Sequence, residues 1–433
     1  MKLIASAVLI LLVSLGTTVA HSQTPDRHHG IQNVVVIFQE NRSPDNLFHG
    51  LPNADIANSG VNSQGQVIPL QPVPLANNFD LSHAHAAFVA MYDNGNMDGA
   101  DKVKVTCPKG GNCPPPNPQF MYVNPSDVAP YFQMAEQYTF ADRMFQTNQG
   151  PSFPAHQFII SGTSAPTDRS DLFAAENPGG VAGALNKTGC TAPAAEIVKM
   201  IDPSGHESSS LYPCFDHLTL LDLLDFHRVS WRYYAPSAGS IWTGPNAIQH
   251  LRFGDDWNNV ILKPAQILTD IQNGQLASVS WVIPTGLASD HPASTDGTGP
   301  SWVASVVNAI GNSQYWDNTV ILITWDDWGG WYDHVPPTVI NSYEYGFRVP
   351  LIVVSPFAKP GYVSHVTHDF GSILNFIEQV YHLPSLGYAD ALADDLSDCF
   401  DFHRHNRFVK IKAPHDAAYF LNDKRTPTDP DDD

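Results

Sequence analysis

Five short apolar runs recur along the chain, and most of them are rich in β-branched residues. Continuous apolarity, without alternation, is typical of parallel strands that are covered on both faces. Stretches with a helical period lie between these runs. We predict strands at 33–39, 229–234, 278–283, 319–324 and 349–355, and helices at 127–137, 218–226, 265–271, 302–310 and 369–380.

Alternation of strands and helices predicts an α/β fold, a three-layer sandwich around a mostly parallel central sheet. In such folds, ligands bind beyond the carboxyl ends of the strands. No linker-like composition divides residues 30–415, so a single domain is predicted there. Within this domain, residues 165–215 are predicted to form a loop-rich insertion near the site.

The two ends of the chain have compositions of their own. Lys2, the apolar residues 3–15 and the small residues up to Ala20 form the pattern of a secretory signal peptide, residues 1–20. We expect export after cleavage near Ala20; an uncleaved N-terminal anchor is the alternative. No later stretch approaches the roughly 18–20 apolar residues that a membrane span needs. Residues 424–433 are predicted to be a disordered acidic tail.

The charge balance limits the class of partner. The 433 residues include 22 Lys and Arg against 43 Asp and Glu, a formal net charge of −21. Such an acidic protein is not expected to bind nucleic acid, or an anionic membrane surface, through charge. A substrate that carries phosphate would therefore need a local cation, most simply a bound metal ion.

Five cysteines allow at most two disulfides within the chain. Cys107 and Cys113 flank a turn-rich segment and are predicted to form one disulfide, and Cys190 and Cys214 are predicted to close a second loop. Cys399 is then left over and expected to be buried. None of the spacings resembles a zinc site, because there is no paired C-x-x-C.

Oxygen-bearing side chains follow two of the predicted strands directly. Glu40 and Asn41 come after the first strand, and Asp326 and Asp327 come after the strand at 319–324. Carboxylate and amide oxygens suit a divalent metal ion, and the glycines that follow Trp328 let the chain turn so that both aspartates converge. The alternative is that these residues cap a turn and solvate a loop.

Ser152 lies between Gly150-Pro151 and an apolar segment that Pro154 can open as a helix. A serine at or just before a helix N-terminus faces backbone N–H groups that favour an anion such as phosphate. The alternative is a simple N-cap, because serine is a preferred residue at that position. The segment lacks the second glycine of a nucleophile elbow, which argues against an ordinary lipase of the α/β-hydrolase type.

Three of the nineteen histidines stand beside other signals: His83, His291 and His334. Near a metal–phosphate site, imidazoles serve as hydrogen-bond donors to phosphate or as proton donors to a leaving group. Each could instead be a structural histidine.

These segments resemble the bacterial secreted phosphoesterase family of phosphatidylcholine-type phospholipases C and some acid phosphatases, within the alkaline-phosphatase-like superfamily. The resemblance extends over about residues 30–402 and is carried above all by ENRSPD and TWDDWGGWYDHVPP. It implies a parallel-sheet α/β sandwich and one divalent metal ion, of unspecified identity. It also implies a covalent phosphoserine mechanism on a small-molecule or lipid-headgroup phosphate ester.

The resemblance also assigns roles residue by residue. It implies Glu40, Asn41, Asp326 and Asp327 as metal ligands and Ser152 as a nucleophile that also contacts the metal. His83, His291 and His334 match histidines placed around the phosphate.

The chain departs from the family pattern at several positions. The family often has Glu at position 327 and Phe at position 44, and Asp369-Phe370-Gly371 replaces its usual Asp-His-Thr/Ser. Little of the sequence follows residue 402, so we expect no counterpart of the long C-terminal extensions of the large haemolytic phospholipases C, and soluble phosphomonoesters stay candidates beside phospholipids and choline-type diesters. Two further classes stay open: a sulfatase-like hydrolase, although Ser152-x-Pro154 is not followed by Arg, and a non-catalytic exported binding protein.

Overall fold

The computed structural model describes residues 30–107, 114–181 and 187–425. Its centre is an eight-stranded sheet. In spatial order the strands are β14 (Val260–Ile261), β13 (Trp231–Tyr234), β15 (Val279–Val282), β1 (Asn33–Gln39), β16 (Thr319–Trp325), β17 (Leu351–Val354), β8 (Thr139–Ala141) and β18 (Tyr362–Ser364). Only β17 of these strands runs antiparallel to its neighbours. The predicted α/β fold with a mostly parallel sheet is confirmed.

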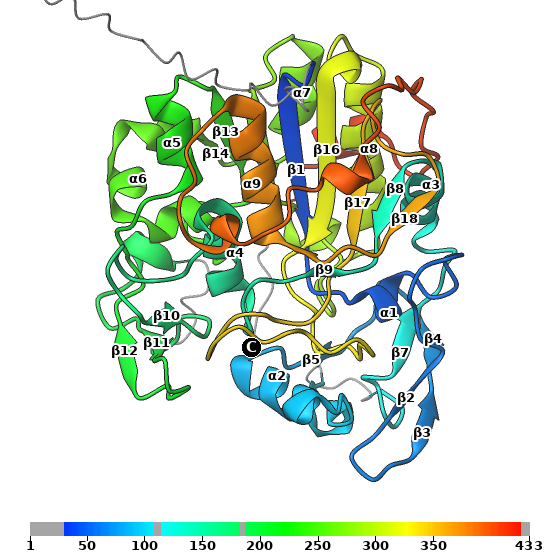
Figure 1. Cartoon of the computed structure of the whole chain (residues 1–433), viewed down its shortest axis with the longest axis vertical. Helices are drawn as coiled ribbons and strands as arrows, with labels where there is room; N and C mark the ends of the chain where they lie inside the picture. Colours follow the sequence, from blue (N-terminus) through cyan, green and yellow to red (C-terminus); the bar gives the residue numbers. More distant parts are fainter. Residues whose placement is uncertain (1–29, 108–113, 182–186, 426–433) are drawn as a thin grey trace, which may run out of the picture.

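Helices cover both faces of this sheet and make three layers (Figure 1). On one face α9 (Phe370–Tyr381) packs against α4 (Ser152–Ser161), and on the other α8 (Gly299–Gly311) packs against α3 (Ala129–Gln137) and α7 (Gln266–Gln272). The central strands β1 and β16 are buried along their whole length, as continuous apolarity predicted. The other helices are α1 (Pro44–Leu47), α2 (His85–Tyr92), α5 (Leu220–Phe226), α6 (Gln249–Phe253) and α10 (Ala417–Leu421).

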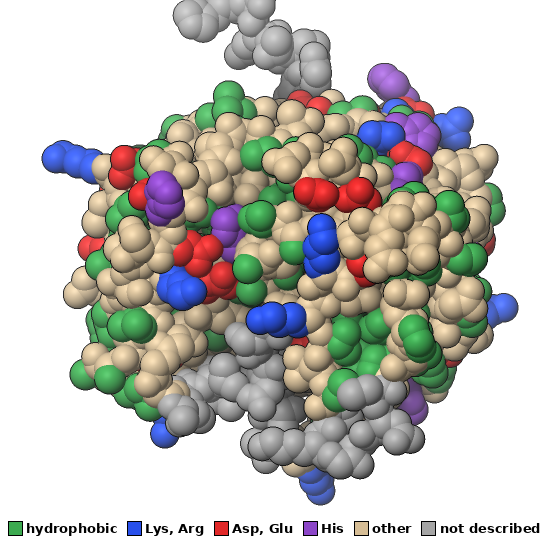
Figure 2. All heavy atoms as spheres, turned by 90° about the horizontal axis from the view of Figure 1, so that it is seen from below, with side chains coloured by type: hydrophobic (Ala, Val, Ile, Leu, Met, Phe, Trp, Pro, Cys, Tyr) green, Lys and Arg blue, Asp and Glu red, His purple; other side chains and the backbone are tan. Residues whose placement is uncertain are grey.

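A smaller apolar cluster lies beyond the carboxyl ends of β1 and β16. It joins α2 to Trp328 and Trp331, which follow β16, and includes Leu81 of β5 (Asp80–Leu81). Short strand pairs border it: β5 with β6 (Val105–Thr106), β2 (Ser59–Val61) with β3 (Val67–Pro69), and β4 (Gln71–Val73) with β7 (Met121–Val123). This cluster encloses the end of the sheet at which the site residues gather. Figure 2 looks onto this end and shows acidic and basic side chains scattered together, without a field of one sign.

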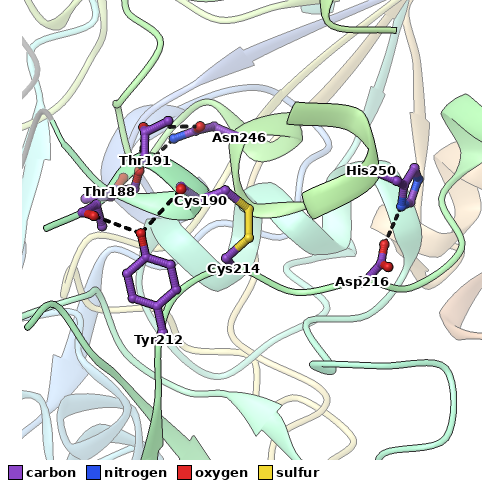
Figure 3. Close-up of a disulfide and its surroundings, with 9 residues drawn as sticks. Thr188, Cys190, Thr191, Tyr212, Cys214, Asp216, Asn246 and His250 are labelled. Atoms are coloured by element: carbon purple, nitrogen blue, oxygen red, sulfur yellow. Dashed lines mark hydrogen bonds and ion pairs between the residues drawn. A yellow bond between two sulfur atoms is a disulfide. The ribbon is translucent and has the colours of Figure 1, made fainter. Parts of the chain in front are cut away.

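The region expected to be a loop-rich insertion contains a small antiparallel sheet of β10 (Phe173–Ala174), β11 (Val198–Ile201) and β12 (Ser209–Leu211). The predicted disulfide between Cys190 and Cys214 is present, with Cα atoms 4.4 Å apart (Figure 3). Beside it, the Tyr212 hydroxyl donates to the carbonyl oxygen of Ala192 at 2.8 Å. The disulfide therefore links the connection between β10 and β11, which contains Cys190, to the segment that follows β12. Cys399 is free and buried, as expected.

Several expectations fall on residues outside the described ranges: the signal peptide at 1–20, Cys113 of the other predicted disulfide, and the tail from residue 426. Arg425, which the prediction placed in the tail 424–433, is described and donates to Asp296 at 2.7 Å. Among the described residues, no helix is long and apolar enough to cross a membrane. The remaining small pair joins β9 (Met144–Phe145) to β19 (His368–Asp369).

Candidate active site

The ends of β1 and β16 bring Glu40 and Asp326 side by side. The two strands are parallel neighbours in a register that pairs Gln39 with Trp325. The Asp326 N–H continues this ladder by donating to the Gln39 carbonyl oxygen at 3.1 Å. Glu40 and Asp326 are both fully buried. The strand register thus places two carboxylates at one point under the smaller apolar cluster.

Asn41 adopts a left-handed backbone conformation with φ of 62°, which asparagine tolerates better than most residues. Its N–H donates to Asp326 Oδ1 at 3.1 Å, and its side-chain Nδ2 donates to His83 Nε2 at 3.0 Å. Because the amide nitrogen is held by His83, the amide oxygen is left for another partner. That oxygen is buried and accepts no hydrogen bond from any described residue.

The Gly329-Gly330 turn positions Asp327 next to Asn41. Both glycines have positive φ, and a Cβ on Gly329 would lie 2.2 Å from the Asn41 carbonyl oxygen. The Gly329 N–H donates to Asp327 Oδ1 at 2.7 Å, and the Arg42 N–H donates to the Asp327 carbonyl oxygen at 3.0 Å. A residue with a side chain could not make this approach, so the turn that holds Asp327 requires glycine.

Ser152 is the first residue of α4, and Pro151 is the N-cap. Its hydroxyl donates to Asp327 Oδ2 at 3.5 Å. The first turn offers fewer N–H groups to an anion than the sequence suggested, because Pro154 has none and the Phe153 N–H donates to Asn177 Oδ1 at 2.9 Å. The simple N-cap interpretation is therefore wrong: the hydroxyl points to the acidic cluster.

Gly150 is also required by packing. A Cβ at this position would lie 2.3 Å from the Tyr343 hydroxyl oxygen and 2.5 Å from the Ala175 carbonyl oxygen. The Tyr343 hydroxyl itself donates to Ala175 at 2.8 Å. The loop that presents Ser152 is thus held against a buried tyrosine.

His83 reaches the site from the loop after β5. Its Nδ1 lies 2.9 Å from the carbonyl oxygen of Leu81, which can only accept, so Nδ1 carries the proton. Nε2 then accepts from Asn41 and lies 3.9 Å from Asp327 Oδ2. In this arrangement His83 orients the Asn41 amide.

His291 stands next to His83, with ring centroids 6.0 Å apart, and next to Trp242 at 6.2 Å. Its Nδ1 donates to its neighbour's carbonyl oxygen, on Pro292, at 2.7 Å. The loop is anchored by Asp290, whose carboxylate accepts from Trp325 Nε1 at 3.0 Å. Burial raises the pKa of Asp290 to about 6. This anchoring ties His291 to the end of β16.

His334 makes a different set of contacts. Its Nδ1 lies 2.8 Å from Asp45 Oδ2, and its Nε2 lies 3.0 Å from Asp55 Oδ1. Arg348 joins the same ion-pair cluster through Asp45 and Asp333. Burial alone would lower the pKa of His334, but Asp45 and Asp333 outweigh it and raise that pKa to about 9. Both ring nitrogens face carboxylates, which gives His334 a structural position.

His156 was not anticipated from the sequence. It lies one turn after Ser152 on α4, fully buried, with Nε2 at 3.4 Å from Glu40 Oε1 and 3.8 Å from Asp326 Oδ2. The spacing of four residues was the available signal, because it puts two side chains on one face of a helix. Glu40, His156 and Asp326 offer ligand atoms within 4.8 Å of one another.

This donor set fits a divalent metal ion. Asp326 Oδ2, like the Asn41 amide oxygen, is buried and accepts no hydrogen bond within the described ranges. Burying carboxylates without a compensating cation is costly. Carboxylate oxygens, an amide oxygen and an imidazole nitrogen are all common metal ligands. A second group that could hold a metal consists of His368 in β19 and of Asp398 and Cys399, which follow α9 in the sequence.

Comparison with known proteins finds a family model that matches most of the chain. The model of the Phosphoesterase family matches residues 31–384. Hemolytic phospholipase C of Pseudomonas aeruginosa is 26% identical over 86% of this chain and 56% of its own length. Phospholipase C B of Mycobacterium tuberculosis is 23% identical over 86% of this chain and 78% of its own. The chain thus spans little more than half the length of the first relative.

Solved structures are similar at a lower level. The structure of a protein of the alkaline phosphatase superfamily from Vibrio parahaemolyticus aligns with 85% of this chain, and the alignment includes 70% of that protein. The identity is 10% and the TM-score 0.40.

Proposed function

Because the chain belongs to the Phosphoesterase family, a family of hydrolases of phosphoric esters, we propose that it is an exported, metal-dependent phosphoesterase with Ser152 as nucleophile. The observation that carries this proposal is the hydrogen bond from Ser152 Oγ to Asp327 Oδ2. It places a helix-terminal hydroxyl in the same buried cluster as Glu40, Asn41 and Asp326. We propose a covalent phosphoserine intermediate.

Glu40, Asn41, Asp326 and Asp327 would hold one divalent ion, with Ser152 beside it. When bound, such an ion lowers the pKa of a neighbouring hydroxyl and offsets negative charge on a phosphate oxygen. The orphaned oxygens of Asn41 and Asp326 support this assignment. His83 contributes by holding the Asn41 amide in the orientation that presents its oxygen.

In the first step, Ser152 Oγ attacks phosphorus and the bond from phosphorus to the alcohol oxygen breaks. The hydroxyl proton passes to Asp327, which already accepts a hydrogen bond from it. Protonated His291 donates a proton from Nε2 to the leaving alkoxide, while its Nδ1 stays bound to Pro292. The alcohol leaves neutral, and Ser152 carries the phosphoryl group.

In the second step, water attacks the phosphoserine and the bond from phosphorus to Ser152 Oγ breaks. His291 takes the proton that water loses, and Asp327 returns its proton to Ser152. Inorganic phosphate, or a phosphate monoester when the substrate is a diester, is released. Both groups return to their starting states, so the cycle balances.

The relatives are phospholipases C, but this chain spans only 56% of the length of the hemolytic phospholipase C, so the substrate class is part of our proposal. We propose a small-molecule or lipid-headgroup phosphate ester. The position four residues after Ser152 holds His156 rather than the arginine of a sulfatase motif, which disfavours sulfate esters.

The deciding assay compares a soluble aryl phosphate monoester with the corresponding phosphorylcholine diester, each with and without a chelator. Chelator-sensitive turnover of at least one substrate is expected. A strong preference for the diester assigns a phospholipase C-like activity, and a preference for the monoester a phosphatase. No turnover of either, with metal supplied, would contradict the proposal.

A further inference from the structure

The position of His156 goes beyond the ligand set that the sequence suggested. The imidazole projects from α4, one turn below Ser152, into the gap between Glu40 and Asp326. All three side chains are fully buried. We infer that His156 Nε2 is a direct ligand of the proposed metal ion, which makes the site a mixed nitrogen–oxygen site; this inference rests on the proposed function.

The hydrogen bonds of Tyr233 fix which nitrogen of His156 faces the carboxylates. The Tyr233 hydroxyl donates its single proton to the carbonyl oxygen of Trp242 at 2.8 Å. Its contact with His156 Nδ1, at 3.3 Å, must therefore run from Nδ1–H to the tyrosine oxygen. Because Nδ1 carries a proton, the neutral imidazole presents the lone pair of Nε2 to Glu40 and Asp326.

This is the arrangement in which proteins bind metals through histidine. A metal-ligating imidazole usually donates its second N–H to an oxygen of the protein, which fixes the ring orientation and the tautomer. Tyr233 supplies that oxygen here, and the Gly244 N–H also donates to the tyrosine oxygen, at 3.4 Å. Tyr233 lies in β13, a strand that carries none of the other proposed ligands.

A nitrogen ligand changes which metal the site should prefer. Mg²⁺ and Ca²⁺ favour all-oxygen sites, whereas imidazole suits Zn²⁺, Fe²⁺ and related ions. His156 also shares a helix with the nucleophile at a spacing of four residues. A metal bound to His156 would therefore fix the turn of α4 that presents Ser152. The competing account is that His156 is a cation that only pairs with Glu40.

The experiment is pulsed electron paramagnetic resonance of protein made with ¹⁵N-histidine, stripped of metal and loaded with half an equivalent of Mn²⁺. We expect a directly bound ¹⁵N coupling in the wild type and its loss in His156→Gln. Calorimetric titration should show Zn²⁺ affinity falling at least about tenfold in this variant, with a smaller change for Mg²⁺. Tyr233→Phe should keep the coupling and lose about 10–100-fold in Zn²⁺ affinity.

His217→Gln is the matched control, because His217 is also buried but bonds to Ala165 and Ser161. It should leave both the coupling and the affinity unchanged. Mn²⁺ bound without nitrogen coupling in an active wild type would overturn the inference and leave the proposed function standing. A wild type that binds metal through ¹⁵N yet hydrolyses no phosphate ester would support the inference about His156 and contradict the proposed function. Circular dichroism on each variant confirms that it is folded.

Discussion

Ser152 Oγ and Asp327 Oδ2 lie 3.5 Å apart, although 175 residues separate them in the sequence. The contact joins the start of α4 to the turn after β16. Both side chains are fully buried. A serine hydroxyl held against a buried carboxylate, next to Glu40 and Asp326, is the geometry from which the predictions below follow.

Asp326 should be required for metal binding. Asp326→Ala removes the oxygen that lacks a hydrogen-bond donor and the acceptor of the Asn41 N–H. Metal content by elemental analysis should fall to background, and turnover should drop at least about 100-fold, as for the loss of an electrostatic group in an active site. Asp317→Asn, at a largely exposed carboxylate, should change neither. Wild-type metal content in folded Asp326→Ala protein would show that Asp326 is not a ligand.

Gly329 should be intolerant of any side chain. Gly329→Ala combines positive φ with a Cβ 2.2 Å from the Asn41 carbonyl oxygen, so the turn must move and displace Asp327 and Asn41. Metal affinity and turnover should both fall at least about tenfold. Gly50→Ala is the control, since Gly50 has φ of +87° but nothing within 4 Å. It should cost only about 1 kcal/mol of stability and no activity; equal losses in the two variants would refute the steric explanation.

His334 should stabilise the fold in a pH-dependent way. Its pKa in the folded protein is raised to about 9, mainly by Asp45, against a usual value near 6.5. Its contribution is therefore fully present below about pH 6.5 and is lost as the pH rises towards 9. Denaturant unfolding of wild type and His334→Gln should show the largest difference at pH 6 and a small one at pH 9. A difference that grows with pH would contradict the ion-pair assignment.

The sequence predicted the central strands well because they are long, apolar and buried on both faces; the interval 33–39 coincides with β1. It missed α2, because the apolar residues of this helix do not gather on one face. It also missed strands of two or three residues such as β9 and β18, because so few residues show no recognisable hydrophobic periodicity. Their existence depends on tertiary pairing.

The site was predictable where chemistry follows a strand directly, as at Glu40 and Asp326. His156 lies inside an apolar helix, and only the fold shows that its face turns to Glu40. His334 follows the same motif as Asp326, but the chain has already turned at Gly329-Gly330, and its ring meets Asp45 instead. No local pattern could distinguish these two outcomes, because both depend on residues far away in the sequence.

The most direct test of the mechanism is to trap the phosphoryl group. Wild-type protein mixed with a phosphate ester, quenched in acid within one turnover and digested, should yield one phosphoryl group on the peptide that contains Ser152. Ser152→Ala should fold normally, bear no phosphoryl group and lose at least about 1,000-fold in turnover, while Ser152→Thr should keep part of it. A phosphoryl group on a histidine, or near-wild-type turnover of Ser152→Ala, would contradict the covalent serine mechanism.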